Sequence, residues 1–183
     1  MVKQEFIITV YTENSLGLLS RIAIMFSRRR INIESLNVAA SEVNGVHHFT
    51  IIVSESEEVI QKLVLQIEKQ VEVLKSFYHT NAAVVLKEHA LYKISGSAAL
   101  LSEAERRLAE FGGRLIASDG ATYKVFETTG SPEITEEVLK VLEPLGLMEF
   151  VRSARVAIDK SGIPLHQKLK HFNAVNSDNY QQV

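Results

Sequence analysis

The stretch FIITVYTENSLGLLSRIAIMF, residues 6–26, determines how the first part of the chain folds. Phe6–Tyr11 is rich in β-branched and aromatic residues and predicts a buried strand. The polar turn Glu13–Gly17 follows this strand. Beyond the turn, apolar residues recur at helical spacing, at positions 18, 19, 22, 25 and 26. The sequence therefore predicts a strand that leads through a short turn into an amphipathic helix.

The pattern continues to residue 78 and completes one structural unit. Asn44-Gly45 is a strong hairpin signal between two strands. Ser54 with Glu57 predicts a capping box at the start of a second amphipathic helix. Further strands are expected at residues 31–38, 49–53 and 71–78. The resulting order, β-α-β-β-α-β, is that of the split β-α-β, ferredoxin-like motif.

The same order recurs in the second half of the chain. Gly112-Gly113 ends a predicted helix, and Asp119-Gly120 is another hairpin signal. Ser131-Pro132-Glu133 is a strong helix start. Strands are expected at residues 91–95, 114–118, 121–128 and 147–158. We therefore predict an α+β protein with two tandem ferredoxin-like βαββαβ domains, each an antiparallel sheet with helices on one face.

The predicted domains are residues 1–80 and 81–160, followed by a polar tail at 161–183. The open face of each sheet needs a cover, which favours side-by-side domains or dimerisation. The tail has room for one weak helix near residues 165–172, and we expect the rest to be poorly ordered.

Composition restricts the possible functions. Apolar residues make up 46% of the chain, enough for a core, and the net charge of −2 predicts no bulk attraction to nucleic acid or membranes. Cysteine is absent, which excludes disulfides and thiolate chemistry. No signal peptide or long apolar run is present. These features predict a cytoplasmic protein.

No local motif indicates catalysis. The chain lacks a Gly-rich phosphate loop, a His-Glu-x-x-His motif and a nucleophile elbow, so we predict no catalytic residues. His47 and His48 are adjacent on a strand and point to opposite faces, so they cannot chelate a metal as a pair. Each can still join His79 or His89 in a metal site, although a role at the surface is the favoured reading.

The turn before the first helix has the features of a binding site. Gly17 lies in the first helical turn, where a missing side chain either serves capping geometry or lets a ligand reach the backbone N–H groups. A carboxylate bound there also gains from the helix dipole. Asn14 can donate to that carboxylate, and Asn32 can accept from an ammonium group. Leu16, Leu18 and Ile33 can surround an aliphatic side chain. The residues therefore suit a zwitterionic amino acid.

These residues also carry a resemblance. Glu13-Asn14-x-x-Gly17-x-Leu19-Ser20-Arg21, followed by Asn32-Ile33-Glu34-Ser35-Leu36, resembles the regulatory small subunit of acetolactate synthase. Its first half is similar to an ACT domain, an amino-acid-sensing module. Ile67-Glu68-Lys69-Gln70 and Glu88-His89-Ala90-Leu91-Tyr92-Lys93 extend the similarity over residues 3–158.

The resemblance implies a function. Such a subunit is not an enzyme; it activates a separate catalytic subunit in branched-chain amino acid biosynthesis and makes it sensitive to valine. Thiamine diphosphate, Mg²⁺ and FAD would belong to that catalytic partner, and this chain would hold no cofactor or metal. Valine would bind between the ACT domains of a homodimer. The implied ligand-binding residues are Asn14, Leu16, Gly17, Leu18, Leu19, Asn32 and Ile33.

Other functions remain open from the sequence. His47-His48-Phe49-Thr50 replaces the Arg-Met-Thr-like stretch that relatives usually carry, and the tail beyond Gly162 is longer than the family core. A stand-alone ACT-type regulator would use the same pocket, but no DNA-binding segment precedes the first domain. A metal-sensing ACT-like protein would use the histidines, and an enzyme is disfavoured by the missing motifs.

Overall fold

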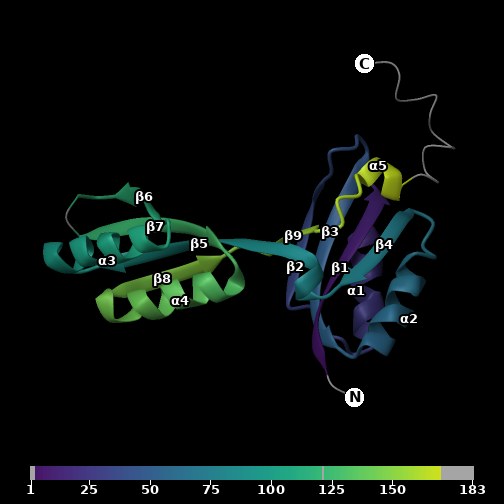
Figure 1. The fold of residues 1–183 in the computed structure, drawn as a ribbon, viewed down its shortest axis with the longest axis horizontal. Helices are drawn as coiled ribbons and strands as arrows, with labels where there is room; N and C mark the ends of the chain where they lie inside the picture. Colours follow the sequence, from purple (N-terminus) through teal and green to yellow (C-terminus); the bar gives the residue numbers. More distant parts are fainter. Residues whose placement is uncertain (1–2, 121, 170–183) are drawn as a thin grey trace. The chain divides into compact units, whose positions relative to one another are not determined.

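The computed structural model describes residues 3–120 and 122–169 as two compact units (Figure 1). The first contains residues 3–85 with 157–169, and the second contains residues 86–156. Each is an antiparallel sheet with two helices on one face, which confirms the predicted fold of two ferredoxin-like βαββαβ repeats.

The first unit has the strand order β2-β3-β1-β4, so β2 lies at an edge of the sheet. Its elements are β1 (Gln4–Glu13), α1 (Leu18–Arg28), β2 (Ser35–Ala40), β3 (Val46–Glu55), α2 (Glu57–Ile67) and β4 (Val73–His79). A short 3-10 helix, η1 (Asn81–Ala83), follows β4.

The second unit repeats this plan with the order β6-β7-β5-β8. Its elements are β5 (Val84–Ser95), α3 (Ala98–Glu110), β6 (Arg114–Ser118), β7 (Tyr123–Gly130), α4 (Pro132–Leu142), η2 (Glu143–Leu145) and β8 (Leu147–Arg152). The predicted final strand at 147–158 is divided, because β8 ends at Arg152 and a separate strand, β9 (Val156–Asp159), pairs with β5.

The structure divides the chain at other positions than the predicted domain boundaries of 80 and 160. The first boundary lies within β5, and residues 157–169 belong to the first unit. Lys160 explains the second difference, because its backbone N–H donates to the Ala83 carbonyl at 3.0 Å and its Nζ donates to the Ala82 carbonyl at 2.9 Å. A short helix, α5 (Leu165–Lys168), occupies part of the helix predicted at 165–172. The remaining prediction, that the rest of the tail is poorly ordered, concerns residues 170–183, which lie outside the described part of the chain.

The end of α1 explains why β2 starts later than the predicted 31–38. Arg30 has a positive φ of 57°, and the Ile31 N–H donates to the Phe26 carbonyl at 3.1 Å. These are the features of a Schellman C-cap, in which the residue after the left-handed one closes the helix. Ile31 is buried in the helix-side core, and β2 begins at Ser35.

The predicted capping box of Ser54 and Glu57 is wrong. The N-cap of α2 is Ser56, and its side chain makes no cap hydrogen bond. Instead, the Glu55 carboxylate accepts from the Ser56 N–H at 3.0 Å and also pairs with Lys3 at 2.9 Å. Because β3 extends through Glu55, Ser54 lies within the strand and cannot cap the helix.

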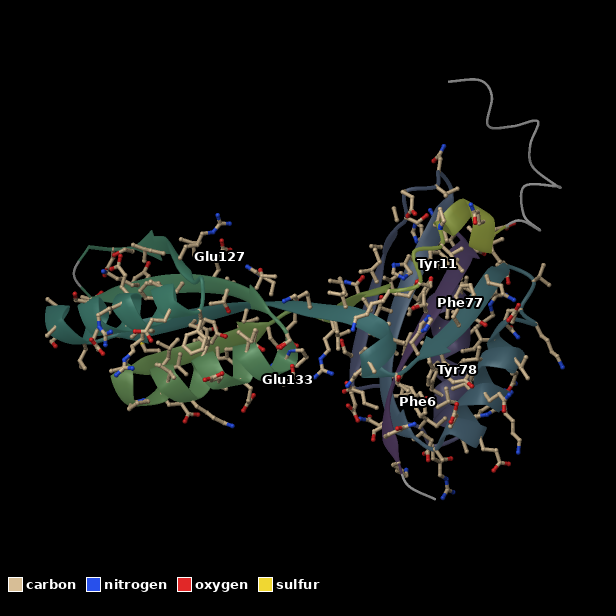
Figure 2. The ribbon with its side chains drawn as sticks, viewed as in Figure 1. Phe6, Tyr11, Phe77, Tyr78, Glu127 and Glu133 are labelled. Carbon is tan, nitrogen blue, oxygen red and sulfur yellow. The ribbon has the colours of Figure 1, made fainter. Side chains whose placement is uncertain are left out.

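The core of the first unit lies between the sheet and its helices. Phe6, Ile8 and Val10 point from β1 toward α1 and α2, and the ring of Phe6 meets that of Tyr78 edge-on at 5.8 Å between centroids (Figure 2). The intervening residues of β1 point to the other face, where Ile7 is fully buried as well. Residues 157–165 line a cavity there with Thr9 and Tyr11, and Leu165 is buried. The C-terminal segment therefore covers part of the face that the helices leave open.

The second unit contains a buried carboxylate. Glu88 on β5 has a fully buried side chain that accepts a hydrogen bond from Thr135 Oγ1 and another from Arg155 Nε at 3.3 Å. Arg152 lies 3.6 Å from the same carboxylate, and Tyr92 Oη donates to the Thr135 carbonyl at 3.1 Å. A buried charge needs such partners. The first residue of the Glu88–Lys93 motif therefore has a structural role in this fold.

Gly146 allows a test of the second unit. It has a φ of +87°, its carbonyl accepts from the Ser95 N–H at 3.0 Å, and an added Cβ would overlap the Ser95 carbonyl oxygen. We expect G146A to lower the free energy of unfolding by about 2–4 kcal/mol, because backbone strain and overlap add. Gly112 has a φ of +70° with no atom within 4 Å of an added Cβ, so G112A should lose only about 1 kcal/mol. Urea unfolding followed by circular dichroism measures both, and equal losses would contradict the overlap.

Candidate functional site

The loop between β1 and α1 lies at one end of the first sheet. The Asn14 N–H donates to the Gly45 carbonyl at 3.2 Å, and the Glu13 N–H donates to the Glu72 carbonyl at 2.9 Å. These bonds hold the loop beside the turn that joins β2 to β3 and next to the start of β4. The asparagine and the glycine of the predicted site are thereby attached to the same end of the sheet.

Gly17 is the N-cap residue of α1 and has a φ of 78°. The helix has no side-chain cap, and its first N–H group, that of Leu18, makes a long hydrogen bond of 3.4 Å to the Ser15 carbonyl. The N–H groups that follow lie in the first turn, where a helix offers no intrahelical acceptor. A Cβ added to Gly17 would meet no atom within 4 Å, and both Asn14 and Gly17 are exposed. The structure therefore brings together an exposed carboxamide, an open space and an uncapped helix N-terminus. That arrangement can hold a carboxylate.

The three predicted leucines differ in their surroundings. Leu16 is fully exposed, and Leu19 is 45% exposed. Leu18 is only 2% exposed and packs in the helix-side core. Its side chain therefore cannot line a surface site, contrary to the role expected for it, whereas Leu16 and Leu19 are accessible to a ligand or a partner.

Asn32 and Ile33 lie at the other end of α1. Asn32 is exposed, and Ile33 is half-buried against the helix-side core. The helix between them and Gly17 has 11 residues and a length of about 16 Å. A free amino acid is much shorter than that distance. The structure therefore does not bring Asn32 together with Asn14 and Gly17 within one copy of the chain.

The two neighbouring histidines have separate surroundings. His48 pairs with Tyr11 in the β1–β3 register and stacks on its ring, with centroids 4.9 Å apart, whereas His47 pairs with Thr12 and points to the other face. Burial lowers the pKa of His48, partly opposed by Glu42. In residues 3–120 and 122–169, no three His, Asp or Glu side chains gather as a metal site requires.

Comparison with known proteins shows the family. A sequence family described as "AHAS small subunit-like ACT domain" matches residues 8–75, and one described as "Small subunit of acetolactate synthase" matches residues 87–161. The acetolactate synthase small subunit of Mycobacterium leprae is 33% identical over 84% of this chain and 90% of its own length. The Bacillus subtilis acetolactate synthase small subunit is 32% identical over 82% of this chain and 88% of its own length.

The chain belongs to the acetolactate synthase small-subunit family. A crystal structure of the small subunit from Thermotoga maritima has the same fold, with a TM-score of 0.78 and 25% identity over 87% of this chain and 99% of that one. The predicted family is confirmed. Membership of the acetolactate synthase small-subunit family supports a role as a regulatory subunit that associates with a catalytic subunit. None of the helices in the described ranges is long and apolar enough to cross a membrane.

The cover that the C-terminal segment provides was not predicted from the sequence. The match to the acetolactate synthase small subunit stops at residue 161, but the structure continues through α5, and Leu165 in this helix and Leu169 just after it are buried. The apolar residues Ile163, Leu165 and Leu169 within a polar tail were the available signal. The pattern predicts a weak helix here, but not which surface its apolar residues contact.

The lowered pKa of His48 predicts a pH dependence. A histidine whose folded pKa is below its unfolded value loses stability as pH falls, because the unfolded chain takes up the proton first. We expect the free energy of unfolding to decrease as the pH falls from about 7 to about 5. H48Q should make this decrease less steep, by an amount that corresponds to the uptake of less than about one proton. Urea unfolding at several pH values measures the free energy of unfolding and its slope with pH. H47Q serves as the control, and an identical change in slope for both variants would contradict the assignment.

Proposed function

We propose that this chain activates an acetolactate synthase catalytic subunit and makes it sensitive to valine. The observation that carries the proposal is the combination of small-subunit matches over both halves of the chain with an open, uncapped helix N-terminus at Gly17. Thiamine diphosphate, Mg²⁺ and FAD would be held by the catalytic partner. The bound amino acid would then be a signal and not a substrate.

The Gly17 site suits the charged ends of an amino acid. Its carboxylate would accept from the first N–H groups of α1 and from Asn14, with a helix-dipole contribution of about 0.3–1 kcal/mol. Asn32 would accept from the ammonium group. Leu19 and Ile33 would contact the aliphatic side chain. Two amides without formal charges suit a zwitterion, because an unpaired charge in the site would be costly.

The separation of Gly17 from Asn32 favours a site shared by two copies. The edge strand β2 begins just after Asn32 and ends near the turn that binds Asn14. If a second copy pairs antiparallel through β2 about a two-fold axis, the start of each β2 lies beside the end of the other. Asn32 of one copy then approaches the Asn14–Gly17 loop of the second. Such a homodimer would contain two equivalent valine sites.

Valine at this interface would favour one arrangement of the two copies and shift the state of the whole enzyme. A coupling free energy of about 1–3 kcal/mol would be enough for useful regulation. A stand-alone ACT-type regulator is the alternative with the same site. The match of residues 87–161 to the acetolactate synthase small subunit favours the regulatory subunit over it.

Reconstitution tests the function and the site together. We expect purified chain to raise the rate of the acetolactate synthase catalytic subunit from the same genome, and valine to lower that rate again. G17D would place a carboxylate where the ligand carboxylate binds, so it should keep activation and lose at least about tenfold in valine affinity. Rates with and without valine, and calorimetry, measure the two effects.

G17A is the matched control, because it introduces the same φ strain at Gly17 without a charge, and an added Cβ has open space. It should keep most of the valine response. Activation that fails for the unmodified chain would overturn the proposed function. Unchanged valine affinity in G17D, with activation intact, would overturn only the site.

Mixed dimers test whether the site is shared. N14A and N32A should each abolish valine binding, but co-expression of the two should restore about a quarter of the sites, because half the dimers are mixed and each has one intact site. Calorimetric stoichiometry measures the fraction. Co-expression of N14A with the N14A/N32A double variant is the control and should restore none. Failure of the first mixture to restore binding would mean that the site lies within one chain.

A further inference from the structure

The first unit contains a cavity on the sheet face opposite its helices. The cavity has a volume of about 320 Å³ and lies between β1 and the C-terminal segment 157–165. Tyr11 contributes to its floor and lies close to α5 (Figure 2). None of residues 13–17 lines this cavity, so it is distinct from the Asn14–Gly17 loop and from the proposed valine site.

The polar groups of the cavity are acidic or neutral. Thr9 and Tyr11 contribute hydroxyl groups, and Glu42 and Asp159 contribute carboxylates. None of the described residues that line the cavity is basic. Burial, with the charges of Glu42 and Asp159, raises the pKa of Tyr11 to about 12. The negative potential around Tyr11 therefore disfavours anions and favours a cationic group.

Two buried polar atoms lie on the same face without a partner. Thr50 is fully buried and pairs with Thr9 in the β1–β3 register, and its Oγ1 has no hydrogen-bond partner among the described residues. The same holds for Nε2 of His48, whose ring stacks on Tyr11. Buried polar atoms in proteins nearly always have a partner. Neither side chain lines the cavity, so these atoms show only that polar groups are buried on this face of the sheet.

The remaining wall of the cavity is aliphatic. Ile158, Ile163 and Leu165 line it together with two smaller apolar residues of the same segment. The last of these residues lie beyond position 161, where the small-subunit match ends. The cavity is therefore completed by the C-terminal extension of this chain.

We propose that this cavity binds a small molecule with an ammonium group on an aliphatic body. The ammonium group would lie near Glu42 and donate to the Thr9 and Tyr11 hydroxyls, while the carbon chain packs on Ile163 and Leu165. Asp159, whose Oδ1 accepts from the Ser161 N–H at 2.9 Å, adds to the negative potential. A free amino acid is disfavoured, because its carboxylate would lie near Glu42 and none of the described lining residues is basic. A divalent metal is disfavoured as well, because the described residues contain no cluster of three or more metal-ligating side chains.

Three molecules with one carbon skeleton test this chemistry on the full chain. Isopentylamine, isopentyl alcohol and isovalerate differ only in the charge of the polar end. We expect isopentylamine to bind saturably and at least about tenfold more tightly than the alcohol, and isovalerate not to bind. Amide NMR shifts should change at Thr9, Tyr11 and Ile158, and calorimetry gives the affinities.

Charge removal provides the matched test. Glu42 is exposed in the turn between β2 and β3, so E42Q should keep the fold, as circular dichroism can verify, and weaken isopentylamine at least about fivefold. E137Q removes an exposed carboxylate from α4 in the second unit and should change nothing. The proposal is overturned by equal affinity for amine and alcohol, by unchanged amine binding in E42Q, by shifts confined to other residues, or by Ca²⁺ displacing the amine.

Discussion

A four-stranded sheet has two faces, and the two helices of a βαββαβ unit can cover only one of them. In the first unit this constraint falls on β1, a central strand with buried side chains under the helices and, on the other face, the fully buried Ile7 beside the half-buried Thr9 and Tyr11. Phe6, Ile8 and Val10 pack under the helices, whereas Ile7, Thr9 and Tyr11 lie on the other face and must be covered by another segment. The C-terminal segment 157–165 covers part of that second face. The cavity at Tyr11 lies between this segment and β1 and is lined by both polar and apolar groups.

The sheet edge imposes the second constraint. β2 is an edge strand, and its unpaired backbone groups can accept another strand. The residues expected to bind valine lie at the two ends of α1, too far apart for one small molecule to reach both. Pairing of β2 with a second copy, as we propose, would resolve this separation, because a two-fold axis reverses the ends. Ligand binding and association of the chain would then be one event, which is how a small effector could influence a much larger complex.

Most of the secondary structure could be predicted from the sequence because helix and strand periods are local properties. The errors lie where a residue has a partner that periodicity does not reveal. Ser54 reads as a helix cap, yet β3 continues past it and Ser56 takes its place. Ile31 reads as the start of a strand, yet its amide closes α1. The leucines of the turn look alike in sequence, but only Leu18 faces the core, because the helix begins at that residue and sets the phase.

The sequence by itself determined the repeated βαββαβ order and the family, since both depend on short-range patterns and fixed spacings. Only the tertiary structure decided that residues 157–169 belong to the first unit, that β2 is one of the two edge strands of its sheet, and that Gly17 and Asn32 are separated by the full length of α1. Those features depend on contacts between residues distant in sequence. Local propensity carries no information about which segment covers which face of a sheet.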